Sequence, residues 1–297
     1  MRTDYTSQLE TILGHTDTFD RKVRRKPALS PQAVNLHIRR WLAGKLIGYV
    51  ISLLSIIIFL WGWNTLSVHK INFGLDFANV PSAQAVAKHL AHAAASKAFY
   101  INVLVSVKRV WLAFAAASLL GCVLGLSLAR ISIMRHIFLP FVEIFRPIPA
   151  IAWIPLAILM FPTTESSILF IVFLGAIFPV ILNTYQGATE VPSQLLRAAR
   201  SLGASRLSVL WHVIIPSSLP NIATGLSVGM GIAWFSLLTA EMIGGQNGIG
   251  NYTWESYQLI KYPDIIVGMI TIGVLSTVSS GLINLMCKPL LRWSGHR

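Results

Sequence analysis

Acidic residues are scarce in this chain of 297 residues, which has 11 Asp and Glu against 24 Lys and Arg. Charged residues of both signs make up only 12% of the sequence, whereas soluble domains carry about 25%. Hydrophobic residues make up 54%, and the mean hydropathy is +0.64. So few charges leave a soluble fold too little polar surface, and the composition therefore indicates an integral membrane protein.

Cysteine and catalytic motifs are also scarce. Cys122 and Cys287 both fall in apolar segments, where a structural disulfide is not expected. The phosphate-binding pattern G-x-x-x-x-G-K-[ST] does not occur, so the sequence predicts no ATP site and no cofactor in this chain. Serine, histidine and acidic residues are scattered without motif context, so no catalytic residue is predicted. His89 and His92 lack a third ligand nearby, which favours interfacial histidines over a metal site.

Long apolar runs dominate the sequence instead. A helix needs about 20 mostly apolar residues to cross the hydrocarbon core of a bilayer. Six segments approach that length, roughly 46–66, 110–129, 137–160, 166–188, 219–243 and 265–287. The third contains Glu143, Arg146 and four prolines, and such breaks are tolerated only where neighbouring protein or a cavity satisfies the freed backbone. We therefore predict an all-α integral membrane protein with six transmembrane helices, the first of which is not a cleaved signal peptide.

The basic residues predict the orientation, because Lys and Arg collect in cytoplasmic loops. With six spans, most of them lie on the side that holds both termini, which we therefore place in the cytoplasm. The run "RKVRRK" near the N-terminus favours a solvated or lipid-facing segment over a nucleic-acid patch. The predicted division is a cytoplasmic basic tail over 1–45, a first transmembrane helix over 46–66, an external segment over 67–109, a transmembrane core over 110–287 and a cytoplasmic tail over 288–297.

The external segment contains one candidate helix. Pro81 and Ser82 provide a helix start, and Val86, Leu90 and Ala93 repeat at helical spacing. We expect a short amphipathic helix on the outer surface.

The stretch "RAARSLGASRLSVLWHVIIP" (197–216) reads at first like a DNA-binding helix-turn-helix. The predicted cytoplasmic connection that holds it, 189–220, is too short for such a domain, and its second helix has almost no polar face for reading bases. No nucleic-acid partner is therefore predicted. Gly203 supplies a turn, Ser205 caps the second helix and Pro216 ends it. Such an exposed hairpin suits docking into a groove on a cytoplasmic partner.

The same stretch resembles the EAA loop of permease subunits of ABC importers, whose pattern is Glu-Ala-Ala, three residues, Gly, nine residues, Ile, any residue, Leu-Pro. Ala198 and Ala199, Gly203 and Pro216 match at the right spacings, while Arg197 replaces the usual Glu. The segments "FRPIPAIAWIPLAILMF" and "AEMIGGQNGIG" look like the nitrate, sulfonate, taurine and bicarbonate branch of these permeases. The resemblance extends from about residue 80 to residue 285.

This resemblance implies the type I ABC importer permease fold in a multi-pass protein of the bacterial inner membrane. It implies a cytoplasmic ABC ATPase dimer that binds ATP and Mg²⁺, a periplasmic or lipid-anchored substrate-binding protein, and a homodimer of the permease. The implied substrate is a small anion, with an organic sulfonate such as taurine ahead of nitrate or bicarbonate. The residues implied in coupling to the ATPase are Arg197, Ala198, Ala199, Gly203, Ala204 and Pro216.

Polar residues inside the spans are candidates for the path, because such groups at membrane depth usually face a bundle or a cavity. Asn183, Ser236 and Thr239 are candidate path residues, although single interhelical hydrogen bonds explain them equally well. Glu241, just before a glycine-rich run, is a candidate gate or a member of a structural pair, and we favour the pair.

Two further pairs of residues predict specific contacts. Gly225 and Gly229 predict a close helix crossing, and Glu143 and Arg146 are spaced to neutralise each other, with an anion site at Arg146 as the alternative. Because no cluster of basic groups lies within the spans, we expect a weak, mostly polar path, with selectivity mainly in the binding protein. An intramembrane enzyme and a membrane scaffold or sensor are the alternative classes of protein.

Overall fold

The structure is a computed structural model that describes residues 31–69 and 79–291, with side chains described from residue 46 onward within these ranges. Most of the predicted tail over 1–45, including the run "RKVRRK", lies outside the described residues. The chain divides into two compact units, Met1–Trp63 and Asn64–Arg297. All regular elements within the described ranges are helical, in agreement with the predicted all-α class.

The first unit consists, in its described part, of helix α2 (Pro31–Val68). The segment Leu46–Val68 has the length and hydropathy of a membrane span. The helix begins well before the predicted start at residue 46, and a proline is well suited to its first turn because φ is already fixed near the helical value. The last turn belongs to the second unit, where the Ser67 hydroxyl donates to the Pro81 carbonyl at 3.4 Å.

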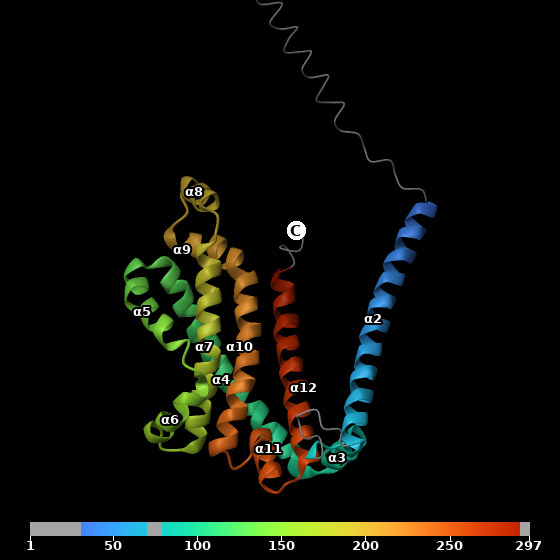
Figure 1. The fold of residues 1–297 in the computed structure, drawn as a ribbon. Helices are drawn as coiled ribbons and strands as arrows, with labels where there is room; N and C mark the ends of the chain where they lie inside the picture. Colours follow the sequence, from blue (N-terminus) through green and yellow to red (C-terminus); the bar gives the residue numbers. More distant parts are fainter. Residues whose placement is uncertain (1–30, 70–78, 292–297) are drawn as a thin grey trace, which may run out of the picture. The chain divides into compact units, whose positions relative to one another are not determined.

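The core of the second unit lies around α7 (Thr164–Thr189), which packs against α4 (Lys97–Arg130) and α10 (Ile215–Gly244). Figure 1 shows these three helices close together in the middle of the unit. They are apolar around most of their circumference, as expected for helices that face protein on one side and lipid on the other. The start of α7 is fixed by Thr163, whose hydroxyl accepts the Ser166 N–H at 3.2 Å.

Small residues allow these helices to approach closely. A Cβ atom added to Gly125 of α4 would lie 2.7 Å from the Ile181 carbonyl oxygen of α7. On α10, a Cβ atom at Gly229 would lie 3.1 Å from the Ala176 carbonyl oxygen, and one at Gly225 would also meet α7. The close helix crossing predicted from the two α10 glycines is confirmed.

The third predicted span, 137–160, is not one straight helix. The chain forms α5 (Ser132–Phe145), the 3₁₀ turn η2 (Ala150–Trp153) and α6 (Ile154–Met160), and the two arms are bent by 98°. Pro147 and Pro149 lie at the break, where their missing N–H groups interrupt the helical hydrogen bonds. The predicted break is therefore a sharp bend between two separate helices.

The predicted external segment over 67–109 contains helix α3 (Ala83–Ala95) and the first turns of α4. Helix α3 is the expected amphipathic helix, and the Ser82 hydroxyl caps it by accepting the Ala85 N–H at 3.3 Å. Helix α4 then begins at Lys97, ahead of the predicted start of the transmembrane core at residue 110. The polar residues in its first half have partners inside the protein, as described below.

Helices α11 (Ile249–Gln258) and α12 (Tyr262–Cys287) and the 3₁₀ turn η4 (Lys288–Leu291) complete the second unit. His89 Nδ1 of α3 lies 2.8 Å from Asp264 Oδ1 of α12, which ties these helices together. No group of metal-ligating residues is found in the described ranges. Five described helices are long and apolar enough to cross a membrane, or six if the bent pair counts as one span.

Candidate functional site

The two ends of the helical core carry different polar features. Figure 1 places α8 (Ser193–Ser201) and α9 (Arg206–Val209) at one end of α7 and α10, and α11 at the opposite end. The first end presents an exposed hairpin of α8 and α9, called the α8–α9 hairpin below. The second holds a buried network of charged and polar side chains.

The turn of the α8–α9 hairpin is built as the sequence predicts. Helix α8 ends in a Schellman motif, in which the Ala204 N–H donates to the Ala199 carbonyl at 3.1 Å. Gly203 has a φ of +78°, in the left-handed region that glycine enters without steric cost. The Ser205 hydroxyl accepts the Ser208 N–H at 3.2 Å and caps α9. The predicted turn and cap are therefore confirmed.

The predicted end of the second helix at Pro216 is wrong. The helix that starts at Arg206 continues through a π-helical turn, η3 (Leu210–Ile214), into α10, and Arg206–Gly244 forms one span of 39 residues. Proline is tolerated in the first turn of a helix, and Pro216 stands in the first turn of α10. The wider π turn ahead of it leaves room for the ring, so the chain stays helical.

The two alanines of the motif occupy different surfaces. Ala198 is exposed, whereas Ala199 is half-buried. Ala199 and Ala204 pack against a small apolar cluster at the base of the hairpin, made of Ala188, Val191, Val209 and Ile214. Of the two alanines, Ala198 is therefore available to a partner, whereas Ala199 packs the hairpin against the rest of the second unit.

The outward surface of the hairpin is basic and apolar. Leu202 is 88% exposed and Leu207 is 64% exposed. Three arginines beside them are also exposed: Arg197, Arg200 and Arg206. No acidic residue occurs between positions 190 and 241 to neutralise them locally. A cavity of about 850 Å³, lined mainly by apolar side chains, lies beside the hairpin.

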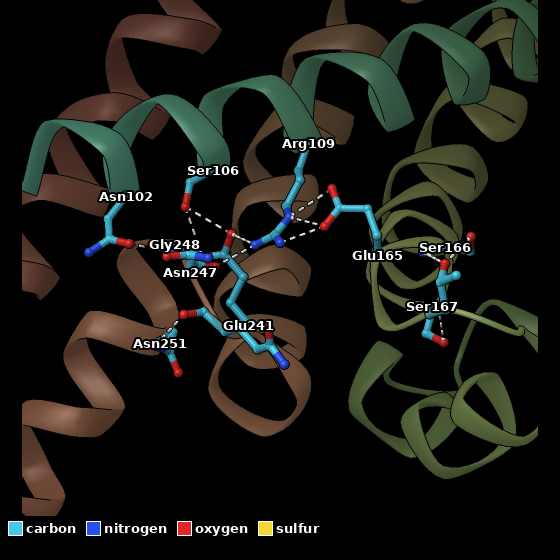
Figure 2. A network of polar contacts seen from close by, with 12 residues as sticks. Asn102, Ser106, Arg109, Glu165, Ser166, Ser167, Glu241, Asn247, Gly248 and Asn251 are labelled. Carbon is cyan, nitrogen blue, oxygen red and sulfur yellow. Dashed lines mark hydrogen bonds and ion pairs between the residues drawn. The ribbon is translucent and has the colours of Figure 1, made fainter. Parts of the chain in front are cut away.

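The buried network at the opposite end centres on an ion pair between α4 and α10 (Figure 2). Arg109 Nη1 donates to Glu241 Oε1 at 2.9 Å, and their side chains are 8% and 1% exposed. The Ser106 hydroxyl donates to the same carboxylate at 2.8 Å. Arg109 also pairs with Glu165 of α7 through Nη2 at 2.6 Å, but that carboxylate is 54% exposed. One guanidinium therefore joins three helices.

The network also fixes the turn between α10 and α11. Side chains of α4 and α10 accept three consecutive backbone N–H groups of this turn, each at 2.9 Å: Gly248 to Asn102 Oδ1, Ile249 to Ser106 Oγ and Gly250 to Glu241 Oε2. Arg109 in turn donates to the Asn247 carbonyl at 2.6 Å. A buried turn must have its backbone groups satisfied, and here side chains supply the partners.

The glycines of this turn are required by close approach. Gly248 has a φ of +124°, and a Cβ atom there would lie 2.3 Å from the Glu241 carboxylate. A Cβ atom at Gly250 would lie 2.7 Å from the Leu238 carbonyl oxygen. The turn can therefore close over the carboxylate only without side chains at both positions.

Glu241 is predicted from the sequence as a gate or a member of a structural pair, but its partners are not. In the structure Glu241 is paired with Arg109, the geometry that a structural pair requires. The missed signal lies in α4, where Asn102, Ser106 and Arg109 recur at positions i, i+4 and i+7. That spacing places all three on one helix face, which marks a polar stripe in an otherwise apolar stretch.

The candidate path residues have local partners. The Asn183 amide donates to the Pro179 carbonyl in its own helix at 2.9 Å. The Thr239 hydroxyl donates to the Phe235 carbonyl in its own helix at 3.1 Å. Ser236 is fully buried, and its hydroxyl has no hydrogen-bond partner.

The predicted pair at the broken span is present. Arg146 Nη2 lies 2.9 Å from Glu143 Oε2, and the two side chains are 47% and 46% exposed. Their mutual neutralisation is therefore confirmed as an exposed pair.

Comparison with known proteins identifies the second unit. Residues 117–290 match the family described as "Binding-protein-dependent transport system inner membrane component". This match covers more than half of the chain and includes both the α8–α9 hairpin and Glu241. The chain belongs to this family. It is a permease subunit and not an enzyme, and ATP hydrolysis belongs to a separate ATPase.

Curated relatives come from the expected branch. The permease is 39% identical over 178 residues to a putative ABC transporter permease protein of Methanocaldococcus jannaschii, covering 60% of this chain and 67% of that protein. It is 33% identical over 178 residues to the nitrate import permease protein NrtB of Synechocystis sp., covering 60% and 65%. It is 29% identical over 270 residues to the taurine transport system permease protein TauC of Escherichia coli, covering 88% and 96%. The named solutes of these relatives differ.

Solved structures support the predicted fold. The inward-facing MetNI methionine ABC transporter matches with a TM-score of 0.52 at 20% identity, over 64% of this chain and 93% of that chain. An amino acid ABC transporter matches with the same TM-score and identity, over 63% and 92%. At this level of identity the likeness concerns the fold alone.

The contribution of the buried ion pair to stability can be tested against that of the half-exposed pair made by the same guanidinium. Replacing Arg109 by Met leaves the Glu241 carboxylate buried without its cation, which should cost about 3–5 kcal/mol of stability. Replacing Glu165, the half-exposed partner of the same guanidinium, by Gln should cost at most about 1 kcal/mol. Thermal denaturation of the detergent-purified variants measures the order of their stabilities.

A double variant, Arg109→Met with Glu241→Met, is the matched control because it removes both charges together. It should melt closer to the wild type than Arg109→Met alone, although the turn loses the Gly250 contact. Equal melting of the two single variants would show that the burial of Glu241 does not set the cost.

Proposed function

We propose that this permease forms the translocation path of an ATP-driven importer for a small anion, with an organic sulfonate such as taurine favoured and nitrate or bicarbonate as alternatives. The observation that carries the proposal is a family match that includes an exposed helical hairpin of the expected pattern. Similarity to the taurine permease extends over 88% of this chain, whereas similarity to the Synechocystis nitrate permease extends over 60%. The longer alignment supports the sulfonate.

The α8–α9 hairpin is the docking element for the ATPase in this proposal. Its exposed leucines and Ala198 form an apolar surface that fits a groove, which is a recurring way for a helix to bind a partner. Coupling involves Arg197, Ala198 and Gly203 at the surface and turn, while Ala199, Ala204 and Pro216 support the hairpin from below. The ATPase dimer binds ATP and Mg²⁺, and this chain needs no cofactor of its own.

The charge of the hairpin sets a requirement on the partner. Arg197 stands where related loops have Glu, and its neighbours Arg200 and Arg206 are also basic and exposed. Charged surfaces dock on complementary potentials, because like charges across an interface cost free energy. The groove of the ATPase should therefore carry carboxylates opposite these arginines.

The hairpin and both termini lie on the cytoplasmic side in this proposal. Exposed arginines gather at the hairpin end of the second unit, as expected for the inner face. Helix α12 ends at the same end of that unit (Figure 1). The opposite end, where α11 and α3 lie, receives the periplasmic or lipid-anchored binding protein in the bacterial inner membrane.

The apolar surface of α12 supports a homodimer. The best span window of the helix is only 17% buried within the chain, against 50% for the windows of α7 and α10. Large exposed side chains along it are Met269, Val274, Val278, Leu282 and Leu285. Two copies packed about a twofold axis would cover part of this surface and enclose one path.

The docking role predicts that Ala198→Glu abolishes co-purification with the cognate ATPase, because a buried carboxylate would enter the apolar contact. Gly203→Val should weaken docking as well, since a β-branched residue in the left-handed region costs about 1–2 kcal/mol. Affinity pull-down from detergent-solubilised membranes that contain both subunits measures the effect.

Gly203→Asn is the matched control, because Asn tolerates the left-handed conformation and a Cβ atom at this position meets nothing within 4 Å. It should co-purify with the ATPase as the wild type does. Normal pull-down and normal uptake with Ala198→Glu would contradict the docking role of the hairpin.

The oligomeric proposal predicts two permease chains and two ATPase chains in the purified complex. Native mass spectrometry of the complex in detergent gives this ratio directly. A complex with one permease chain per two ATPase chains, or with a second and different permease, would overturn the homodimer.

The substrate proposal predicts ATP-dependent accumulation of taurine in proteoliposomes that contain the permease, its ATPase and its binding protein. Radiolabelled taurine, nitrate and bicarbonate are compared at equal concentration, with a non-hydrolysable ATP analogue as the control. Accumulation of nitrate or bicarbonate in place of taurine would support the alternative anions. Absence of ATP-dependent uptake for all three would overturn the small-anion proposal.

A further inference from the structure

The cavity of about 850 Å³ beside the α8–α9 hairpin combines cations with a hydrophobic wall. Its volume is within the range of pockets that bind small molecules. Three arginines from three different helices line it: Arg130 ends α4, Arg200 lies in α8 and Arg206 begins α9. The rest of the wall is mostly apolar and includes Leu126, Ile131, Leu196, Leu207, Leu210 and Ile214.

The positive charges of this cavity are not neutralised by acidic side chains. Within the described residues, none of the three guanidinium groups takes part in an ion pair. Arg130 and Arg200 are close enough for their charges to repel each other. The segments that line the cavity lie in stretches without Asp or Glu, 77–142 and 191–240. The cavity therefore carries an excess of positive charge that an anionic ligand can offset.

One of the guanidinium groups is held in place by the backbone. Arg130 Nη2 donates to the Ala188 carbonyl in the last turn of α7 at 2.5 Å. This acceptor carries no net charge, so the bond orients the guanidinium without cancelling its charge. The carboxylate of Glu190, two residues further on, accepts the side-chain amides of Gln186 and Asn221 instead. Arg130 therefore keeps N–H groups in a fixed position for an anion.

The cavity lies where a membrane-spanning helix ends. Lys97–Arg130 has the length and hydropathy of a span, and Arg130 is its last residue. The hydrocarbon core of the bilayer therefore ends close to this arginine, near the depth of the lipid headgroups. In the proposed orientation this is the cytoplasmic side, where basic pockets between transmembrane helices bind anionic headgroups.

We propose that this cavity binds one membrane phospholipid with a net negative charge, such as phosphatidylglycerol. Its phosphate lies among Arg130, Arg200 and Arg206, and part of an acyl chain lies against the leucines of the wall. Arginine binds phosphate oxygens through parallel N–H groups, and the acyl chain removes apolar side chains from water. One phosphate then joins α4 to both helices of the hairpin and offsets the repulsion between their charges. This inference goes beyond the proposed transport function and does not depend on the solute.

Other occupants match the cavity less well. A soluble phosphate or a carboxylate of the ATPase would meet the arginines but leave the apolar wall in contact with water. A zwitterionic lipid would bring a cation of its own to a cluster that has no acidic residue. The lipid is compatible with docking of the ATPase, because Arg197 does not line the cavity and stays exposed on the hairpin. Arg200 and Arg206 have five N–H donors each, enough to bond a phosphate and a carboxylate together.

The test uses the permease in complex with its ATPase, purified in a non-ionic detergent. Phosphatidylglycerol and phosphatidylcholine with the same acyl chains are added at equal concentrations, and glycerol 3-phosphate supplies a phosphate without a chain. Native mass spectrometry counts the lipids retained on the complex, and thermal unfolding measures the stabilisation that a bound ligand gives by mass action. We expect phosphatidylglycerol to be retained and to raise the unfolding temperature, with little effect of the other two.

Variants locate the binding. Arg130→Gln and Arg206→Gln should each weaken phosphatidylglycerol binding about tenfold, because each loses hydrogen bonds to a charged group. Arg130→Lys should weaken it less, since the charge remains but the parallel N–H groups do not. Arg135→Gln is the matched control, because it removes a charge near the start of α5 at a position that does not line the cavity. Other basic residues also attract anionic lipid, so the difference between Arg130→Gln and Arg135→Gln measures the site.

Equal binding of the two lipids, or equal losses in Arg130→Gln and Arg135→Gln, would overturn the site. Stabilisation by glycerol 3-phosphate as large as that by phosphatidylglycerol would assign the arginines to a soluble phosphate and overturn the lipid. Phosphatidylglycerol that binds the permease alone but not the complex would assign the arginines to carboxylates of the ATPase, which also overturns the proposal.

Discussion

The buried ion pair between the Arg109 guanidinium and the Glu241 carboxylate determines how one end of this permease is built. Charged groups in an apolar interior are costly unless they are paired and fully hydrogen-bonded. Here that condition is met only if α4, α10 and the turn after α10 lie in one arrangement, because Ser106 and the Gly250 N–H complete the shell of the carboxylate. The charges therefore specify a geometry that apolar packing alone would leave open.

The absence of side chains is equally important elsewhere in the core. Gly125 and Gly229 let α4 and α10 approach α7 closely, so that contacts between backbones replace the interdigitation of large side chains. Gly175 has a related role, because its missing side chain makes room for the Ser236 hydroxyl. Close packing in this protein thus depends on positions that carry no side chain.

Much of this architecture could be predicted from the sequence, and what could not be predicted has more than one cause. Apolar length identified the membrane helices, and local turn chemistry identified Gly203 and Ser205. Partners distant in sequence form the buried network, and the polar face of α4 was not predicted to be buried because its acceptors and donors lie more than 50 residues away. Pro216 looked like a helix end because no local rule signals the π turn that precedes it. Burial likewise separated Ala198 from Ala199, which are neighbours of the same residue type.

The uninterrupted helix from Arg206 to Gly244 gives these two ends a mechanical relation. Its first turn belongs to the hairpin, and its last turn carries the carboxylate that holds the glycine turn in place. A helix is stiff along its axis, so a tilt imposed at one end appears as a displacement at the other. The widened turn at η3 interrupts the regular α-helical hydrogen bonds of this rod, so we expect a bend between its two ends to form there.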